Sequence, residues 1–185
     1  MTPPPDRPAP ALADPGDGAP ATSPRALREL LGDGPVCGGD EWATLTADET
    51  AAWQGFLQAH AEIQLELERE LNAAHRLSFS DYFALLALAR APGGGLRMHD
   101  LAKPVRLTRS GLTRLVERLE RDGLLERVPC PDDARGTEAR ITEAGRRLVH
   151  EASRTHLAGV RRRFLDRFSA AELAVLAEQM RRLTG

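Results

Sequence analysis

Several residue types are scarce in this chain of 185 residues, and each scarcity narrows the range of folds and functions. Aromatic residues make up 4% of the chain and Leu and Ala dominate, a composition that favours helices packed on helices. Two cysteines, Cys37 and Cys130, are too few for a disulfide framework. No run approaches the roughly 18 apolar residues of a membrane span, and no apolar segment follows the N-terminus as in a signal peptide. We therefore expect a cytoplasmic protein.

Lysine occurs once, at Lys103, so arginine carries nearly all of the positive charge. The net charge of -2 argues against indiscriminate binding to nucleic acid. One segment departs from this balance, with seven cations against three acids: Arg97, Lys103, Arg106, Arg109, Arg114, Arg118 and Arg121 against Asp100, Glu117 and Glu120. An ordinary solvated helix face mixes the two signs more evenly, so the excess indicates a local basic surface.

Helix signals frame this basic segment on both sides. Residues 1–40 are rich in Pro, Ala and Gly and are predicted to be a disordered or loosely structured leader. Thr46 and Glu49 form a capping-box pattern that starts a long helix with a full apolar stripe, and such helices usually pack against a partner. A shorter helix is expected from Ser78, ending at Pro92 and the glycine run 93–95.

A third long helix is expected after the cap Thr142, with apolar residues continuing through Phe164 to Phe168. Ser169 and Glu172 form another capping-box pattern that opens a last helix. The expected organisation is a single domain at 41–185, with helical regions 46–72 and 143–184 at its ends and a small region at 78–142 between them.

The central region predicts a winged helix-turn-helix, and the whole chain a mainly α fold with a small β-wing. A short helix at 98–105 precedes a turn and a basic helix capped by Thr108. The buried stripe of that basic helix has the spacing i, i+3, i+4, i+7: Leu112, Leu115, Val116 and Leu119. Two short strands around a polar loop follow from Leu124.

The side chains opposite this stripe suit the edges of DNA bases. Arginine can pair two ways with guanine, while Ser and Thr bond bases or phosphates. Arg118, farther along, is predicted to contact phosphate or to pair with Glu117. In the polar loop, Arg135 suits a narrow minor groove, with Asp133 orienting it. The predicted DNA-binding residues are Thr108, Arg109, Ser110, Thr113, Arg114, Arg118 and Arg135.

One small DNA-binding region reads only a few base pairs, and a two-fold dimer on a palindromic operator overcomes that limit. We therefore expect a homodimer formed by the two terminal helical regions. The partner would be double-stranded DNA.

The run LTRSGLTRLVERLERDGLLER at 107–127, followed by Asp133-Ala-Arg135 and then by Ile141-Thr-Glu-Ala-Gly145, resembles the MarR (multiple antibiotic resistance regulator) family. The resemblance covers roughly 46–183. It implies a homodimeric winged-helix transcription regulator, often a repressor released by small phenolic or other ligands, or by oxidation. Pro104 in the first helix of the motif and the polar pair Glu138 and Arg140 in the second wing strand depart from the family pattern.

In this family, effectors commonly bind between the dimer helices and the DNA-binding region. By position, Trp53, His60 and Tyr82 are candidates to line such a pocket for a small phenolic or other aromatic effector. The alternative is that Trp53 and Tyr82 belong to the core and His60 to the interior or an interface. Cys37 and Cys130 are candidates for a redox switch; the alternative is that they are incidental thiols, since nothing nearby clearly lowers their pKa.

Other chemistries lack their motifs. The five histidines show no metal-ligand spacing, and no cofactor is expected. A nucleophile elbow, a phosphate loop and a metalloprotease motif are all missing, which argues against an enzyme. Three functions remain: a repressor relieved by a ligand, a constitutive or architectural DNA binder without an effector, and a helical module that binds an acidic protein.

Overall fold

The computed structural model describes residues 44–105, 107–130 and 133–184, and the side chains of all of these except 130, 133–135 and 184. The predicted leader at 1–40, which includes Cys37, lies outside the described residues. The chain forms two compact units, Met1–Glu62 and Ile63–Gly185, with the boundary inside helix α2 (Ala47–His75). Within the described ranges, every helix is too short or too polar to cross a membrane.

Helix α2 begins where the capping-box pattern predicted. The Thr46 backbone N–H donates to Glu49 Oε2 at 2.8 Å, and the Glu49 N–H donates to Thr46 Oγ1 at 3.2 Å. Two of the amides that every helix start leaves unpaired are thereby satisfied. In the first unit this helix carries a row of stacked rings, Trp53 on Phe56 and Phe56 on His60, at centroid distances of 6.2 and 6.1 Å.

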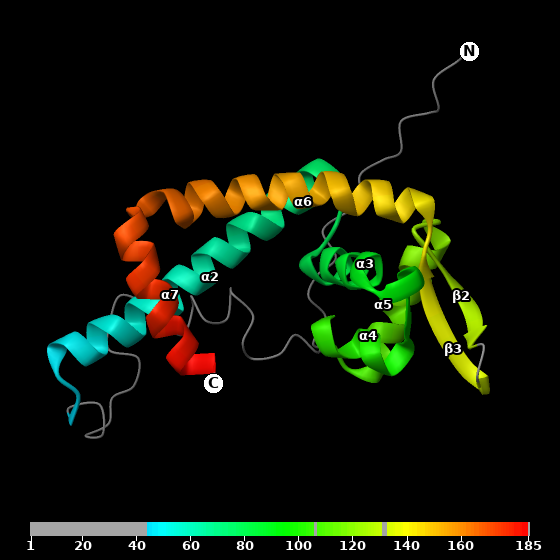
Figure 1. Cartoon of the computed structure of the whole chain (residues 1–185), viewed down its shortest axis with the longest axis horizontal. Helices are drawn as coiled ribbons and strands as arrows, with labels where there is room; N and C mark the ends of the chain where they lie inside the picture. The colour runs from blue at the N-terminus through cyan, green and yellow to red at the C-terminus, as the bar shows by residue number, and fades with distance from the viewer. Residues whose placement is uncertain (1–43, 106, 131–132, 185) are drawn as a thin grey trace, which may run out of the picture. The chain divides into compact units, whose positions relative to one another are not determined.

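The second unit contains the expected helix-turn-helix. Helix α3 (Phe79–Arg90) starts at the N-cap Ser78, and helices α4 (Met98–Val105) and α5 (Arg109–Arg121) follow. Pro104 lies in the last turn of α4, which ends one residue later, as expected for a residue without a backbone N–H. Figure 1 shows these three helices grouped beside the hairpin described next.

The wing is a sheet of three antiparallel strands in the order β1-β3-β2. Strands β2 (Leu125–Cys130) and β3 (Asp133–Ile141) form the expected hairpin. Strand β1 (Gly95–Arg97) was not predicted, because three residues after a glycine run carry no periodic signal. It pairs with the part of β3 that contains Glu138 and Arg140, so these polar residues belong to the central strand.

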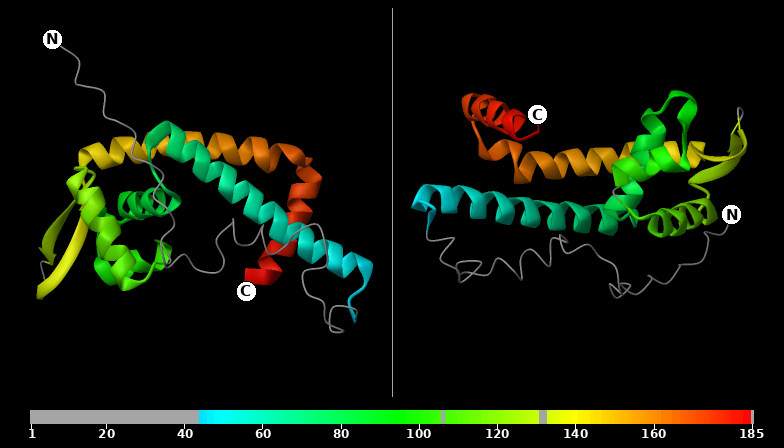
Figure 2. Two further views of the ribbon diagram at one scale, coloured as in Figure 1. Left: turned by 180° about the vertical axis from the view of Figure 1, so that it is seen from behind. Right: turned by 90° about the horizontal axis from the view of Figure 1, so that it is seen from below.

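Helix α6 (Glu143–Arg163) leaves the base of the hairpin, with Thr142 as its N-cap. The prediction that this helix continues through Phe168 is wrong. Phe164 leaves helical geometry with φ -129° and ψ -66°, and a 3-10 turn, η3 (Leu165–Arg167), precedes α7 (Ala170–Thr184). Figure 2 shows the resulting sharp turn between α6 and α7. Apolar spacing could not reveal it, because the Phe164 and Phe168 rings pack on each other at 5.4 Å across the turn.

The core of the second unit gathers side chains from α3, α4, α5, the sheet and α6. The four residues of the predicted stripe of α5 are all buried in it, which confirms that stripe.

Ion pairs join α6 to the part of α2 that lies in the second unit. Arg163 Nη2 lies 2.7 Å from Glu70 and 3.1 Å from Glu66, and Arg162 Nη2 lies 2.9 Å from Glu70. Each arginine thus ties α6 to the end of α2 that lies in this unit.

Candidate nucleic-acid interface

The N-terminus of α5 is capped as predicted and lies at the surface. Thr108 Oγ1 accepts a hydrogen bond from the Gly111 N–H at 3.2 Å. The Thr108 and Ser110 hydroxyls lie 3.2 Å apart, and the Thr113 hydroxyl donates to the Arg109 carbonyl at 3.0 Å. These hydroxyl groups therefore already have local partners. The exposed start of a helix also favours phosphate, because unpaired amides and the positive end of the helix dipole meet there.

Arg109 and Arg114 lie free on this face near the N-terminus of α5, and Arg121 is likewise exposed and without a partner among the described residues in its last turn. Arg109 and Arg114 are both exposed, and neither side chain forms a hydrogen bond or ion pair with another described residue. A free guanidinium can donate two parallel hydrogen bonds to O6 and N7 of guanine. The two arginines lie on the face opposite the buried stripe, so they can meet a duplex while the stripe stays in the core.

Arg118 has a different partner from the one expected. Its guanidinium donates to the Asp81 carboxylate of α3, whereas the sequence suggested phosphate or Glu117. Asp81 is buried, with 7% of its side chain exposed, while 47% of the Arg118 side chain remains in solvent. The ion pair therefore fixes α5 against α3. No local pattern predicts this ion pair, because 37 positions separate the two residues.

Strand β2 of the wing is joined to α5 by a second ion pair. Arg127 of β2 binds the Glu120 carboxylate of α5, with 2.6 Å between Arg127 Nη2 and Glu120 Oε2. The hydrogen bond from Arg127 lowers the pKa of Glu120 and raises that of Arg127. The side chains of the predicted wing contact Arg135, its orienting residue Asp133 and the candidate thiol Cys130 lie outside the described side chains.

The predicted effector residues fall in different surroundings. Tyr82 is 3% exposed, belongs to the core, and its hydroxyl donates to Ser153 Oγ at 3.2 Å, in agreement with the core alternative. Trp53 is 48% exposed, so its assignment to the core is wrong. His60 is likewise exposed and stacks on Phe56 in the first unit. Trp53 and His60 thus belong to the ring row of α2, and Tyr82 to a packed interior.

His156 of α6 was missed by the sequence reasoning. Its ring lies 5.1 Å from that of Tyr82, 5.9 Å from Phe79 and 6.2 Å from Phe83, all three on α3. Its Nδ1 atom is buried and has no hydrogen-bond partner among the described residues. The available signal was its spacing, because His156 continues the stripe of α6 formed by Val149 and Ala152.

The pH dependence of stability tests this packing. Burial lowers the pKa of His156 from its ordinary value of 6.5, so the unfolded chain binds the proton more tightly than the folded chain does. The contribution of neutral His156 is complete above pH 6.5 and is lost as the pH falls below that value. Melting temperatures between pH 7.5 and 5.5 should therefore fall less in His156→Gln than in the wild type. His150→Gln, on the exposed face of the same helix, should show the same change of melting temperature with pH as the wild type. An equal change in all three proteins would contradict the packing of His156.

The described part of the chain holds no candidate metal centre. Across the described ranges, no three His, Cys, Asp or Glu side chains are grouped so that they could hold a metal ion. The chemically prominent surface is the exposed face of α5 beside an antiparallel wing. A capped helix with a buried stripe on one side and free arginines on the other, following a first helix and a turn, defines a winged helix-turn-helix DNA-binding protein.

Comparison with known proteins specifies the family. Residues 77–136 match the sequence profile of the MarR family. The homoprotocatechuate degradative operon repressor of Escherichia coli is 30% identical over 121 residues, which span 65% of this chain and 79% of that protein. The chain belongs to the MarR family of transcriptional regulators, and with it to a class of DNA-binding repressors.

Solved structures agree with this assignment. The MarR family regulator Sco3205 from Streptomyces coelicolor, in complex with DNA, matches with a TM-score of 0.69 and 34% identity over 76% of this chain and 88% of that one. The regulator AbsC from the same organism matches with a TM-score of 0.69 and 31% identity, over 76% of this chain and 94% of its own. Both similarities extend well beyond the helix-turn-helix, which confirms the predicted mainly α fold with its β-wing.

Proposed function

We propose that this MarR family protein is a homodimeric, sequence-specific repressor that binds a palindromic operator and is released by a small-molecule effector. The observation that supports the proposal most directly is the pair of unpaired arginines, Arg109 and Arg114, on the exposed face of α5. Thr108, Ser110 and Thr113 flank them and would bond phosphates or bases. Arg135 of the wing would contact the neighbouring minor groove, oriented by Asp133.

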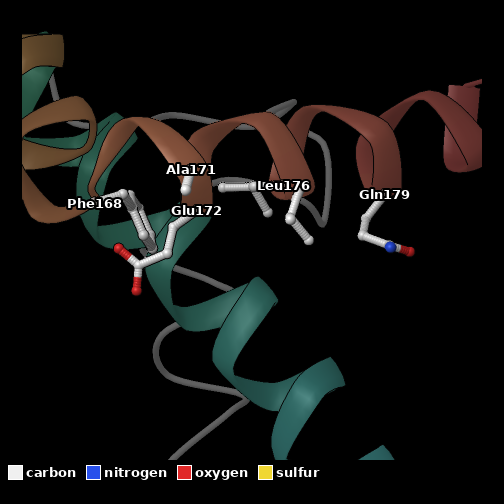
Figure 3. A pocket seen from close by; sticks show the side chains of 6 residues that line it. Phe168, Ala171, Glu172, Leu176 and Gln179 are labelled. Carbon is white, nitrogen blue, oxygen red and sulfur yellow. The ribbon is translucent and has the colours of Figure 1, made fainter.

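Exposed apolar surface supports the homodimer. Along α7 lies an apolar cleft of about 430 Å³, lined by Phe168, Ala171, Glu172, Val175, Leu176 and Gln179 (Figure 3). Val175 is 61% exposed and Leu183 is 70% exposed. Trp53 and Phe56 add an exposed aromatic row on α2. Exposed apolar surface such as that of α7, and separately that of the row on α2, marks protein interfaces, and a two-fold dimer would place two α5 helices roughly 34 Å apart on the DNA.

Substitution of the free arginines tests the DNA contact. Arg109→Ala and Arg114→Ala should each weaken operator binding by about 1–3 kcal/mol and relax the base preference at one position of each half-site. Arg154→Ala, an exposed arginine of α6 without a partner among the described residues, is the matched control and should change affinity little. Binding is measured at several salt concentrations on a duplex that the full-length protein selects from a random library.

The same assay separates the alternatives. A selected palindrome that binds two chains, a much weaker half-site and a strong salt dependence support the repressor. Equal affinity for random DNA would favour an architectural binder, and an absence of DNA binding would favour a helical module for an acidic protein. Unchanged affinity in both arginine variants would contradict the assigned contacts.

Release by an effector is proposed from the family resemblance. A small phenolic or other aromatic compound is the expected class, and its binding should lower the affinity for the selected duplex. If no compound of a phenolic panel changes DNA binding or Trp fluorescence, the protein is a constitutive repressor.

Thiol oxidation at Cys37 or Cys130 is the other candidate signal. Under this alternative, peroxide should release DNA from the wild type but not from the Cys37→Ser, Cys130→Ser double variant. As a DNA-binding regulator, the protein would act in the cytoplasm.

A further inference from the structure

The junction between α5 and the wing is built around one carboxylate. Glu120 Oε1 accepts the backbone N–H of Arg127 at 3.1 Å, and Glu120 Oε2 accepts the Arg127 Nε–H at 2.9 Å. Together with the ion pair to Nη2, one side chain of α5 thus holds both the backbone and the guanidinium of a single residue of β2.

The backbone bond is informative because β2 is an edge strand. In the order β1-β3-β2, strand β2 has β3 on one side and no strand on the other. Outward N–H groups of an edge strand have no partner in the sheet. Glu120 supplies that partner at Arg127, two residues beyond the first residue of the strand, Leu125.

The turn between α5 and β2 and the pairing of β1 with β3 give the wing its other attachments. Gly123, at φ 72°, reverses the chain, its carbonyl accepts the Thr142 hydroxyl at 2.8 Å, and the Leu124 carbonyl accepts the Thr142 N–H at 3.1 Å. These bonds hold the base of the hairpin. Strand β1 holds the hairpin from the side of β3 as far as Glu138. On the side of β2, Glu120 adds an attachment to α5 farther along the strand than the turn, and this attachment opposes a tilt relative to that helix.

The length of the hairpin makes that tilt matter. Six residues of β2 span roughly 20 Å, so a tilt of about 10° would displace the far end by about 3 Å, the length of a hydrogen bond. The ion pair itself is largely solvated, with 34% of the Glu120 and 40% of the Arg127 side chain exposed. Solvated pairs contribute little to folding stability, so the consequence of this pair lies in geometry.

We propose that Glu120 is a positioning residue for DNA binding: by holding Arg127 it fixes the direction in which the wing leaves α5. The major-groove contacts of α5 and the minor-groove contact of the wing can then be made together. The inference rests on the proposed function, because it requires a wing that contacts DNA. It also assigns Arg127 to the protein scaffold.

The test compares two acids on the same helix. Glu120→Ala and Glu117→Ala each remove one negative charge that acts on Arg127, but Glu117 forms no hydrogen bond or ion pair with another described residue, so only Glu120→Ala removes the attachment. Full-length variants are footprinted with hydroxyl radicals on the duplex selected by the wild type. Glu120→Ala should keep protection around the major-groove site and lose the flanking minor-groove protection. It should bind DNA roughly tenfold more weakly, because the contact between the wing and the DNA, about one charged hydrogen bond, is lost. Glu117→Ala should keep both protections.

Two further variants separate positioning from a general loss of structure. Arg127→Ala should reproduce the footprint of Glu120→Ala, and both should melt close to the wild type. In a double-mutant cycle, Glu120→Ala should add little to Arg135→Ala, because both remove the same wing contact. A wild type without any footprint would contradict the proposed function and the inference with it. A normal wild-type footprint that Glu120→Ala leaves intact, or full additivity in the cycle, would overturn the inference alone.

Discussion

Replacing Asp81 with alanine is expected to lower the free energy of unfolding by about 3 kcal/mol and to weaken DNA binding at the same time. The buried carboxylate accepts the Ser78 N–H at 3.1 Å and the Ser78 hydroxyl at 2.7 Å, which completes the capping box of α3. Its other oxygen accepts the Arg118 guanidinium of α5. One substitution therefore removes the side-chain half of the capping box, up to about 1 kcal/mol, and the acid of a partly buried ion pair.

The exposure of Arg118 to solvent reduces the free-energy cost of losing the ion pair. Arg118 is 47% exposed, so its guanidinium can turn into water when Asp81 is removed, and the cost stays below that of a fully buried pair. DNA binding should nevertheless suffer, since α5 loses a side-chain attachment to α3 and its exposed arginines are held less firmly. Unfolding is followed in urea, and DNA affinity is measured at a temperature where every variant is folded.

Ser78→Ala is the matched control for Asp81→Ala. It removes the hydroxyl that caps α3 and leaves the contact between Asp81 and Arg118 in place. We expect it to cost about 1 kcal/mol and to leave DNA affinity unchanged. If Asp81→Ala were no less stable than Ser78→Ala, the ion pair would contribute nothing to the fold. If its DNA affinity were normal as well, the attachment would not position α5.

The sequence predicted those features of the fold that depend on near neighbours. Thr46 with Glu49, Ser169 with Glu172, and Thr108 with Gly111 are three positions apart, and all three caps are present. The buried stripe of α5 follows from a 3.6-residue period. Such signals are local, because a helix start and a helix face are decided within one or two turns.

The missed features depend on contacts between distant residues. The bond between Asp81 and Arg118, the pairing of β1 with β3 and the ring cluster around His156 each join segments that only the folded chain brings together. The break at Phe164 was hidden for another reason, since its ring still packs on Phe168. The alternative that placed Trp53 in the core is wrong because apolar spacing identifies a helix face but cannot tell which surface will cover that face.

The excess of positive charge around α5 likewise has one part that the sequence predicts and one part that only the folded structure shows. The sequence located it, but only the structure separates cations with protein partners from cations without them. Arg118 and Arg127 are bound by Asp81 and Glu120, and Lys103 lies 2.9 Å from Asp100, whose pKa this bond lowers. Arg109 and Arg114 have no such partner among the described residues. The candidate interface is therefore narrower than the charged segment, which sharpens the choice of residues for mutation.

Replacing Gly145 with alanine should be at least as damaging as the loss of Asp81, with an expected cost of about 3 kcal/mol or more. A Cβ atom at Gly145 would lie 2.1 Å from the Leu124 carbonyl oxygen and 2.8 Å from Ile141 Cγ1. The closer atom is backbone and already accepts the Thr142 N–H at 3.1 Å, so it cannot move aside cheaply. The turn between α5 and β2 or the start of α6 must shift instead, and the wing would shift with it.

Gly55→Ala is the matched control, because the same methyl group there meets nothing within 4 Å and lies on an exposed face of α2. It should stabilise the protein by about 0.5–1 kcal/mol, since alanine is the better helix former. Urea unfolding of the two variants beside the wild type should therefore show shifts of opposite sign. A Gly145→Ala protein as stable as the wild type would contradict the close approach of α6 to the turn. A stable variant with weakened DNA binding would instead mean that the turn yields and carries the wing away from its groove.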